Sequence, residues 1–177
     1  MKRAATSIVG LFTLLSIAAA QPSSSNTGLL LDPKFETLGK PGAVWKLDVH
    51  KEAAATAERT EVDGTPAVVV TVPAVAPKEW HVQFQQNKVS LEKDVRYKLE
   101  VTGKADREFP ILLFVQQQDK PYAMLGPAVK ENLVSETKTL THEFTSKATD
   151  SNVKIAVVLG AGAGKVTISS ITLTRVN

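Results

Sequence analysis

The 177-residue sequence contains no cysteine, which excludes disulfide bonds and thiolate metal sites and leaves a hydrophobic core to hold the fold. No apolar stretch is long enough to span a bilayer as a helix. Lys and Arg form no cluster of the kind that binds phosphates, which argues against a nucleic-acid partner. Aromatic residues make up 6% of the chain, so any that gather near polar side chains are informative.

The chain begins with the pattern of a secretory signal peptide. Lys2 and Arg3 precede a short apolar segment, Ile8–Ile17, and small residues up to Ala20 provide a cleavage site. We therefore predict a secreted protein, extracellular or periplasmic.

The remainder divides into two parts. Residues 21–28 are rich in Ser, Pro, Asn and Thr and predict a flexible leader, and residues 29–177 predict one domain. Removing residues 1–20 takes two positive charges from a formal net charge of +3, which leaves about +1. The domain itself is therefore nearly neutral.

Short apolar segments with period-two alternation recur through this domain, and no long segment has the helical period of 3.6. About ten strands of this kind predict an all-β fold, a two-sheet antiparallel β-sandwich of the jelly-roll type. The segment 52–62 could be helix or strand by composition, and we predict strand because its surroundings are β. The predicted strands are 43–49, 52–62, 67–72, 80–86, 89–91, 95–103, 111–118, 139–144, 153–159 and 166–173.

Turn signals separate these strands. Asp63-Gly64 predicts a tight hairpin, and residues 119–127 predict a loop. The glycine-rich run 160–164 before Lys165 has neither the spacing nor the Ser or Thr of a phosphate-binding loop, and it predicts a hairpin turn.

The sequence W-H-V-Q-F-Q-Q, which begins at Trp80, organises the functional prediction. On a strand, Trp80 and Phe84 share a core-like face, while His81, Gln83 and Gln85 share the opposite, amide-rich face. His81 could donate to a ligand from that face or be a solvated surface residue.

Apart from Gln21, every other glutamine lies in this segment or in the run 116–118. An amide offers donors and an acceptor without charge, which suits a neutral ligand rich in hydroxyl groups, such as a sugar. By strand parity Gln116 and Gln118 belong to the same surface, and Tyr122 follows in a loop, where binding residues are frequent. A ladder of amides that stabilises neighbouring strands is the alternative for these glutamines.

The two tryptophans, Trp45 and Trp80, each have two interpretations. A tryptophan in a β-sandwich is commonly a core residue, but an indole at a strand end can also stack on a sugar ring.

Signatures of catalysis are absent. No G-x-S-x-G motif is present, and the carboxylates of Glu36, Asp63, Glu79 and Asp119 cannot be paired from the sequence. The three histidines lie on separate predicted elements, so we predict no zinc site. We expect a protein that is not an enzyme, with a small polysaccharide-cleaving enzyme as the least favoured alternative.

Several motifs together resemble the CenC-type carbohydrate-binding modules, the group that joins families 4, 9 and 16. Each motif is weak alone, but their order and spacing extend from about Leu29 to Val176. The motifs are Asp32-Pro33-Lys34-Phe35-Glu36, Trp45, Asp63-Gly64 with Ala67, Trp80-His81-Val82-Gln83, Tyr97, Lys104-Ala105, Phe144 and Leu159-Gly160.

This resemblance implies a galactose-binding-like jelly roll that binds polysaccharide chains without catalysis. Trp80 and Gln83 occupy the family's binding positions, with Trp45 as a further match. Such modules commonly accompany a glycoside hydrolase, which is the implied partner. The resemblance also implies a structural calcium ion held by Glu36 and an aspartate in the last strand, where this sequence has Ser169-Ser170; no other cofactor is expected.

The sequence therefore predicts a secreted carbohydrate-binding protein that uses aromatic stacking and glutamine hydrogen bonds. Its binding residues are predicted to be Trp80, Gln83, Gln85, Gln116, Gln118, Tyr122, His81 and Trp45. A cell-envelope module that holds a protein partner is the alternative from a different class, because fold alone does not separate the two.

Overall fold

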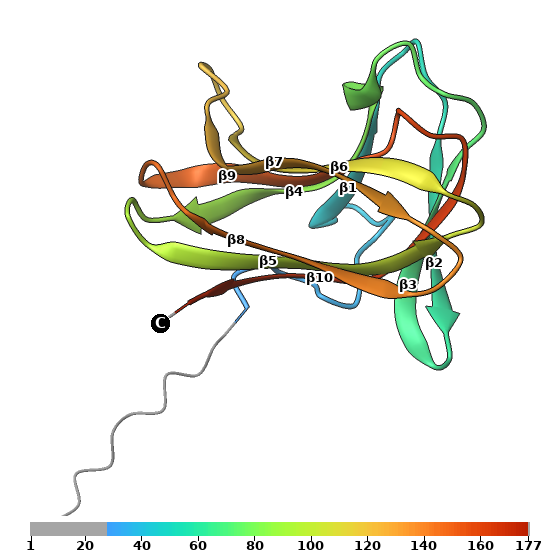
Figure 1. Ribbon diagram of the computed structural model, residues 1–177, viewed down its shortest axis with the longest axis horizontal. Coiled ribbons are helices and arrows are strands. Elements are labelled where there is room, and N and C mark those ends of the chain that lie inside the picture. Colours follow the sequence, from blue (N-terminus) through green and yellow to red (C-terminus); the bar gives the residue numbers. More distant parts are fainter. Residues whose placement is uncertain (1–27, 177) are drawn as a thin grey trace, which may run out of the picture.

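The computed structural model describes residues 28–176, which form two antiparallel sheets of five strands packed face to face (Figure 1). Sheet A has the order β1 (Trp45–Val49), β4 (Val82–Leu91), β9 (Asp150–Val158), β6 (Phe109–Gln117) and β7 (Met124–Leu133). Sheet B has the order β2 (Thr56–Val62), β3 (Thr65–Val72), β10 (Gly164–Arg175), β5 (Arg96–Ala105) and β8 (Lys138–Thr145).

The all-β sandwich is thus confirmed, with one 3-10 helix, η1 (Glu79–His81), before β4. The predicted signal peptide and all but the last residue of the predicted leader lie outside the described residues. Within the described part, we find no helix with the length and apolar character needed to cross a membrane.

The core fills the space between the sheets, and its centre on the β1–β4 side is aromatic. The indole of Trp45 stacks on Phe84 with ring centroids 5.2 Å apart and an angle of 9° between the ring planes, and Phe35 packs against both rings. Trp45 is 1% exposed. This burial corrects the expectation that Trp45 lines a binding surface, because no face of its indole is free for a ligand.

One buried amide connects the start of the domain to sheet A. The side chain of Gln86 accepts a hydrogen bond from the Leu31 backbone N–H and donates one to the Leu31 carbonyl, both at 2.8 Å. The Trp45 indole N–H donates to the same carbonyl at 3.2 Å. Gln86 therefore faces the interior and completes the hydrogen bonding of a segment that belongs to neither sheet.

The predicted strands are mostly confirmed, with differences at the ends. The hairpin at Asp63-Gly64 joins β2 and β3, and both residues have positive φ. β2 begins at Thr56, later than predicted, and β4 runs without interruption to Leu91 across two register shifts.

Three predictions are wrong. A loop was predicted over residues 119–127 and no strand directly after it, whereas residues 124–133 form β7, an edge strand in which Gly126 and Pro127 are tolerated. The glycine run is no hairpin, since it carries the chain from β9 in sheet A to β10 in sheet B. Trp80 lies in η1, so strand parity does not place its side chain.

We predict that Gln86→Leu lowers the free energy of unfolding by about 2 kcal/mol, because the Leu31 N–H and carbonyl lose partners in a partly buried place. Urea unfolding monitored by circular dichroism measures this loss. Lys40→Ala, on an exposed turn, is the control and should change stability by less than about 0.5 kcal/mol. An unchanged midpoint for Gln86→Leu would contradict the structural role given to this amide.

Candidate functional site

The candidate site is the outer face of sheet A, the side turned away from sheet B. Alternation along β4 points Gln83, Gln85 and Asn87 outward, because Val82 and Phe84 point into the core. On β6 and β9 the outward residues build a small second cluster, separate from the main core, of Phe114, Ala156 and Val158 with Leu112 and Met124 packed against it. The face therefore has an apolar centre and a row of amides along one side.

Strand register places these groups across the sheet. Gln85 lies opposite Ala156 on β9, and Ala156 lies opposite Phe114 on β6. Gln116 shares the side of Phe114, two residues along β6, and Gln118 directly follows the strand. The parity prediction thus agrees with the places of Gln83, Gln85 and Gln116 in the sheet, whereas Gln118 lies just beyond its strand.

Two projections rise beside this face (Figure 1). One is η1 with the connection that leads into it from β3, and the other is the loop between β6 and β7. Each carries an exposed aromatic side chain: Trp80 in η1 is 46% exposed and Tyr122 in the loop is 50% exposed. Among residues 28–176 these are the aromatic side chains with large exposure.

Two outward glutamines hold these projections. Gln83 Nε2 donates to the Trp80 carbonyl at 2.8 Å, and Gln116 Nε2 donates to the Tyr122 carbonyl at 2.7 Å. No hydrogen bond joins one glutamine side chain to another in the described part of the chain. The amide-ladder alternative is therefore wrong, and Gln83 and Gln116 act as positioning residues for the aromatic residues.

The backbone of Tyr122 has a conformation that needs such support. Its φ is +58°, in the left-handed region that is uncommon for bulky residues. Besides the bond from Gln116, the Tyr122 N–H donates to the Asp119 carbonyl at 2.8 Å, and Gln117 N–H donates to the Ala123 carbonyl at 2.9 Å. An exposed aromatic residue held in this conformation is typical of a functional position.

η1 is fixed from the other side by the β9–β10 connection. The Gly160 N–H donates to the Glu79 carbonyl at 3.0 Å, and a Cβ atom at Gly160 would collide with that carbonyl oxygen. His50 N–H also donates to the His81 carbonyl at 2.8 Å. Trp80 is thus exposed on a backbone with little freedom to move.

A hollow of about 330 Å³ opens beside the amide row, lined in part by Lys46, Gln85 and Asn87. Gln85 Oε1 and Asn87 Oδ1 have no hydrogen-bond partner, although both atoms are shielded. Gln118 Oε1 is a third acceptor in this condition. Each of these three oxygens is a hydrogen-bond acceptor that no donor in the described part of the chain uses.

Lys154 crosses the middle of the face. Its ammonium lies 5.1 Å from the centre of the Phe114 ring and 3.3 Å from Gln83 Oε1. Burial lowers the pKa of Lys154, and the nearby carboxylate of Asp48 partly opposes this effect. Both polar atoms of the Gln83 side chain therefore have partners, Lys154 for the oxygen and the Trp80 carbonyl for the nitrogen. The oxygen of Gln85, the other outward glutamine of β4, has none.

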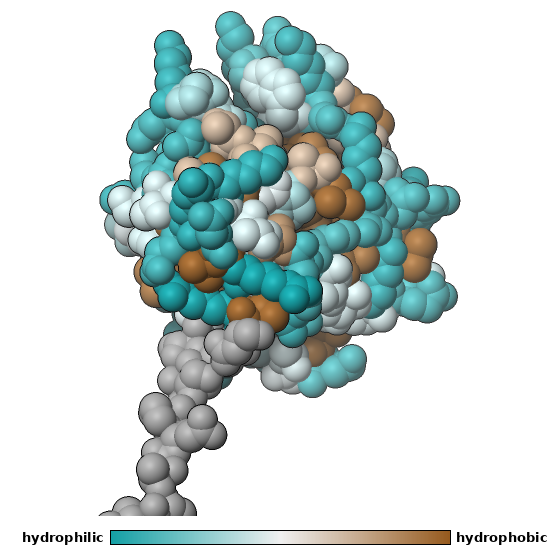
Figure 2. All heavy atoms as spheres, turned by 60° about the vertical axis from the view of Figure 1, so that its left-hand side comes forward, coloured by the Kyte–Doolittle hydropathy of each residue, from teal (hydrophilic) through white to brown (hydrophobic). Residues whose placement is uncertain are grey.

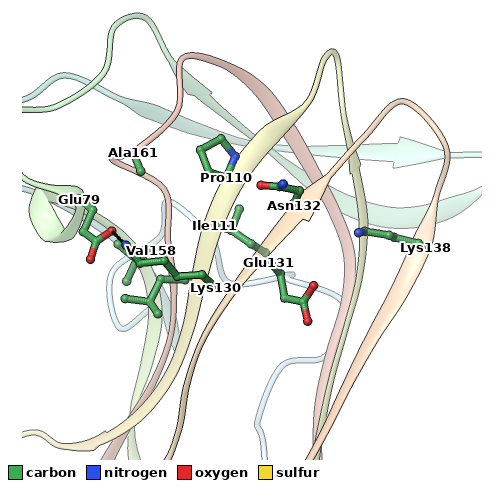
Figure 3. A pocket seen from close by; sticks show the side chains of 10 residues that line it. Glu79, Pro110, Ile111, Lys130, Glu131, Asn132, Lys138, Val158 and Ala161 are labelled. Carbon is green, nitrogen blue, oxygen red and sulfur yellow. Dashed lines mark ion pairs between the residues drawn. The ribbon is translucent and has the colours of Figure 1, made fainter.

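A second hollow, of about 390 Å³, lies at the η1 end of the face (Figure 3). Glu79 and Lys130 form an ion pair across it at 3.0 Å, and Val158 and Leu112 contribute its apolar wall. The two hollows lie at different borders of sheet A, one beside β7 and the other beside β1.

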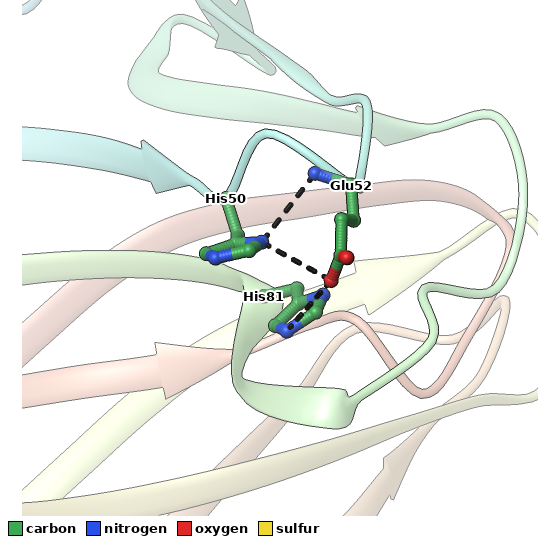
Figure 4. Close-up of side chains that lie close together, drawn as sticks. All are labelled: His50, Glu52 and His81. Carbon is green, nitrogen blue, oxygen red and sulfur yellow. Dashed lines mark hydrogen bonds and ion pairs between the residues drawn. The ribbon is translucent and has the colours of Figure 1, made fainter.

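A cluster that the sequence did not predict lies behind Trp80 (Figure 4). The imidazoles of His50 and His81 stack with centroids 4.2 Å apart, and Glu52 Oε2 lies 3.6 Å from His50 Nδ1 and 3.9 Å from His81 Nε2. His81 is 1% exposed, which corrects the expectation that it shares the amide face. Burial lowers the pKa of His81.

The residues that the family resemblance assigns to a calcium site do not provide the two carboxylates that the site would need. Glu36 is exposed and belongs to no group of three metal-ligating side chains within residues 28–176. The Ser169 hydroxyl, at the place of the expected aspartate, donates to the Thr102 carbonyl at 3.3 Å. We therefore derive no role for calcium.

Comparisons with known proteins agree with this architecture. Residues 28–165 match a family model described as a carbohydrate binding domain. A solved CBM4 structure is 23% identical, with a TM-score of 0.67, over 84% of this chain and 97% of the other. The second N-terminal cellulose-binding domain of Cellulomonas fimi β-1,4-glucanase C is 25% identical, with a TM-score of 0.66, over 88% and 98%.

A more distant likeness shows the fold alone. The CBM22-1 xylan-binding domain from Paenibacillus barcinonensis Xyn10C is 10% identical, with a TM-score of 0.57, over 77% of this chain and 88% of the other. A search of curated proteins finds no match.

We predict that Gln83→Leu and Gln116→Leu each loosen one projection and leave the other unchanged. Losing a bond worth about 1 kcal/mol should speed local amide exchange about fivefold, near Trp80 in the first variant and near Tyr122 in the second. Hydrogen exchange followed by mass spectrometry measures both segments in one experiment, so each variant is the control for the other. Uniform acceleration over both segments would contradict separate anchoring.

Proposed function

We propose that this chain, which belongs to the family of carbohydrate binding domains, binds a polysaccharide chain across the outer face of sheet A. It does so without catalysis, as a binding module whose polysaccharide is of plant or microbial origin. Export through the predicted signal peptide and an accessory role beside a glycoside hydrolase are part of the same proposal.

The observation that carries the proposal is the hollow beside β4. Gln85 Oε1 and Asn87 Oδ1 are acceptors without partners on a surface that also presents two exposed aromatic side chains. Sugar hydroxyl groups are donors that would satisfy such acceptors, and the C–H face of a sugar ring packs on an aromatic ring. Neutral amides and aromatic rings on one surface suit a polyol better than an anion.

The residues divide into two roles under this proposal. Trp80 and Tyr122 stack on sugar rings, and Gln85, Asn87 and Gln118 accept hydrogen bonds from hydroxyl groups. Gln83 and Gln116 hold the aromatic residues in place, because their amide N–H groups are committed to backbone carbonyls. Trp45 and His81 take no part in contacting the sugar, since both are buried.

The spacing of these groups favours an extended ligand. Gln83 lies on β4 and Gln116 on β6, with β9 between them. Gln116 is also displaced by four residues along the strand direction, so the two residues are about 17 Å apart. A single sugar ring cannot reach both projections, whereas an oligosaccharide can.

We predict that Trp80→Ala and Tyr122→Ala each weaken oligosaccharide binding by about five- to thirtyfold, the loss of about 1 to 2 kcal/mol of stacking. Isothermal titration against soluble β-glucan, xylan, mannan and pectin fragments measures the effect and identifies the glycan. Val75→Ala, an exposed apolar side chain in the same connection as Trp80, is the matched control and should bind normally. If no glycan in the panel binds, or both variants bind as tightly as the unchanged chain, the proposal is wrong.

Chain length provides an independent prediction. For the glycan that binds, affinity should rise by about tenfold or more from the monosaccharide to an oligosaccharide that spans both projections, and then level off, because a short ligand gains one aromatic contact instead of two. If a monosaccharide binds at Trp80, Tyr122→Ala should lower the affinity for the longer oligosaccharides more than the affinity for the monosaccharide. Equal affinity for all lengths would instead indicate recognition of a chain end.

A protein partner is the second candidate, and the surface gives it less support. Figure 2 shows, for the end of the molecule in view, hydrophobic residues in small separate patches among hydrophilic ones. A stable docking surface would require a larger continuous apolar area. Shielded amide acceptors on the outer face are also better matched by hydroxyl donors than by apolar side chains.

A further inference from the structure

The His50–Glu52–His81 cluster brings together three metal-ligating side chains from two parts of the chain (Figure 4). His50 directly follows β1, Glu52 lies on the next turn, and His81 ends η1. One ligand atom from each lies within 4.8 Å of the others. Among the described residues this is the group of three with that geometry.

The facing atoms of His50 and Glu52 suit a cation placed between them. His50 Nδ1 accepts a hydrogen bond from the Glu52 backbone N–H at 3.4 Å, so this atom carries a lone pair. The Glu52 carboxylate oxygen, a second acceptor, lies 3.6 Å from the same atom. Two acceptors that face each other without a proton repel, and a cation placed between them turns this repulsion into coordination.

His81 adds a ligand that is already ordered. It is 1% exposed, its Nε2 lies 3.9 Å from Glu52 Oε2, and the Trp80 ring packs on it in a T-shaped arrangement with centroids 4.3 Å apart. Its backbone is fixed by bonds from His81 N–H to the Lys78 carbonyl and from His50 N–H to the His81 carbonyl. A buried neutral imidazole is the form that binds metals.

We propose that His50, Glu52 and His81 form a binding site for a divalent transition-metal ion of the zinc class. Zinc bonds to nitrogen and oxygen of about 2.1 Å in a tetrahedral arrangement place neighbouring ligand atoms about 3.4 Å apart. The separations of 3.6 and 3.9 Å from Glu52 Oε2 are close to this value. The two imidazoles stack with 23° between their planes, so the partly exposed His50 ring must turn out of the stack for its lone pair to point at the ion that His81 binds. The half-exposed Glu52 side chain can turn as well, and water would take the fourth position.

The donor set separates this site from one for hard cations. Two imidazoles and one carboxylate suit zinc, copper or nickel, whereas calcium and magnesium prefer several oxygen ligands. The site goes beyond carbohydrate binding and does not rest on it, since none of its three ligands belongs to the proposed sugar contacts.

Isothermal titration of the untagged chain with ZnCl₂ tests the proposal. We expect one saturable site that His50→Gln and Glu52→Gln each weaken by about tenfold or more, because each removes one of three protein ligands. His142→Gln is the matched control: this third histidine lies on β8, 3.1 Å from Glu131, and its loss should leave zinc affinity unchanged. CaCl₂ should not compete for the site.

Tryptophan fluorescence gives a second readout that needs no ligand variant. Bound Cu²⁺ would lie beside the Trp80 ring, so CuCl₂ should quench emission saturably in the unchanged chain, and Trp80→Phe should remove most of the change. The proposal is overturned if zinc gives no saturable binding, or if His50→Gln and Glu52→Gln bind zinc as tightly as the unchanged chain while circular dichroism shows that they are folded. Glycan titration is unaffected by either result, so failure here leaves the carbohydrate proposal standing.

Discussion

The stack of Trp45 on Phe84 is the contact on which the rest of sheet A depends. It fixes which side of β4 faces the core, and the paired hydrogen bonds between Gln86 and the Leu31 backbone reinforce that choice two residues later. Because side chains alternate along a strand, Gln83 and Gln85 must then point outward. A slip of one residue would exchange the two sets and bury amides that have no partners in the core.

The outward amides are not equivalent, and their hydrogen bonds explain the difference. Gln83 and Gln116 donate to carbonyls of the residues that carry the exposed aromatic rings, and Lys154 takes the oxygen of Gln83. Gln85 Oε1 is left without a partner in a hollow. Glutamines of one sheet thus either hold a neighbouring projection or keep an acceptor without a partner, and neighbouring groups decide which role each amide takes.

Strand parity was enough to predict the sandwich and the common face of the glutamines, because both follow from local alternation. It also implied Asn87, which continues the series of Gln83 and Gln85 by two residues but was not predicted. Parity failed at Trp80, since this residue lies within a 3-10 helix of three residues, which breaks the period of two. The pairing of His50 with His81 depends on β1 lying beside β4, a contact between distant segments that no local pattern contains.

η1 shows why an exposed aromatic residue in this fold need not be a flexible one. With three residues per turn, Trp80 and His81 point in different directions from the same short backbone, one toward solvent and the other into the packed cluster with His50. Gln83, Gly160 and His50 each bond to a carbonyl of this helix. The ring of Trp80 is therefore ordered before any ligand arrives, and a ligand that stacks on it does not have to supply the free energy of ordering the helix.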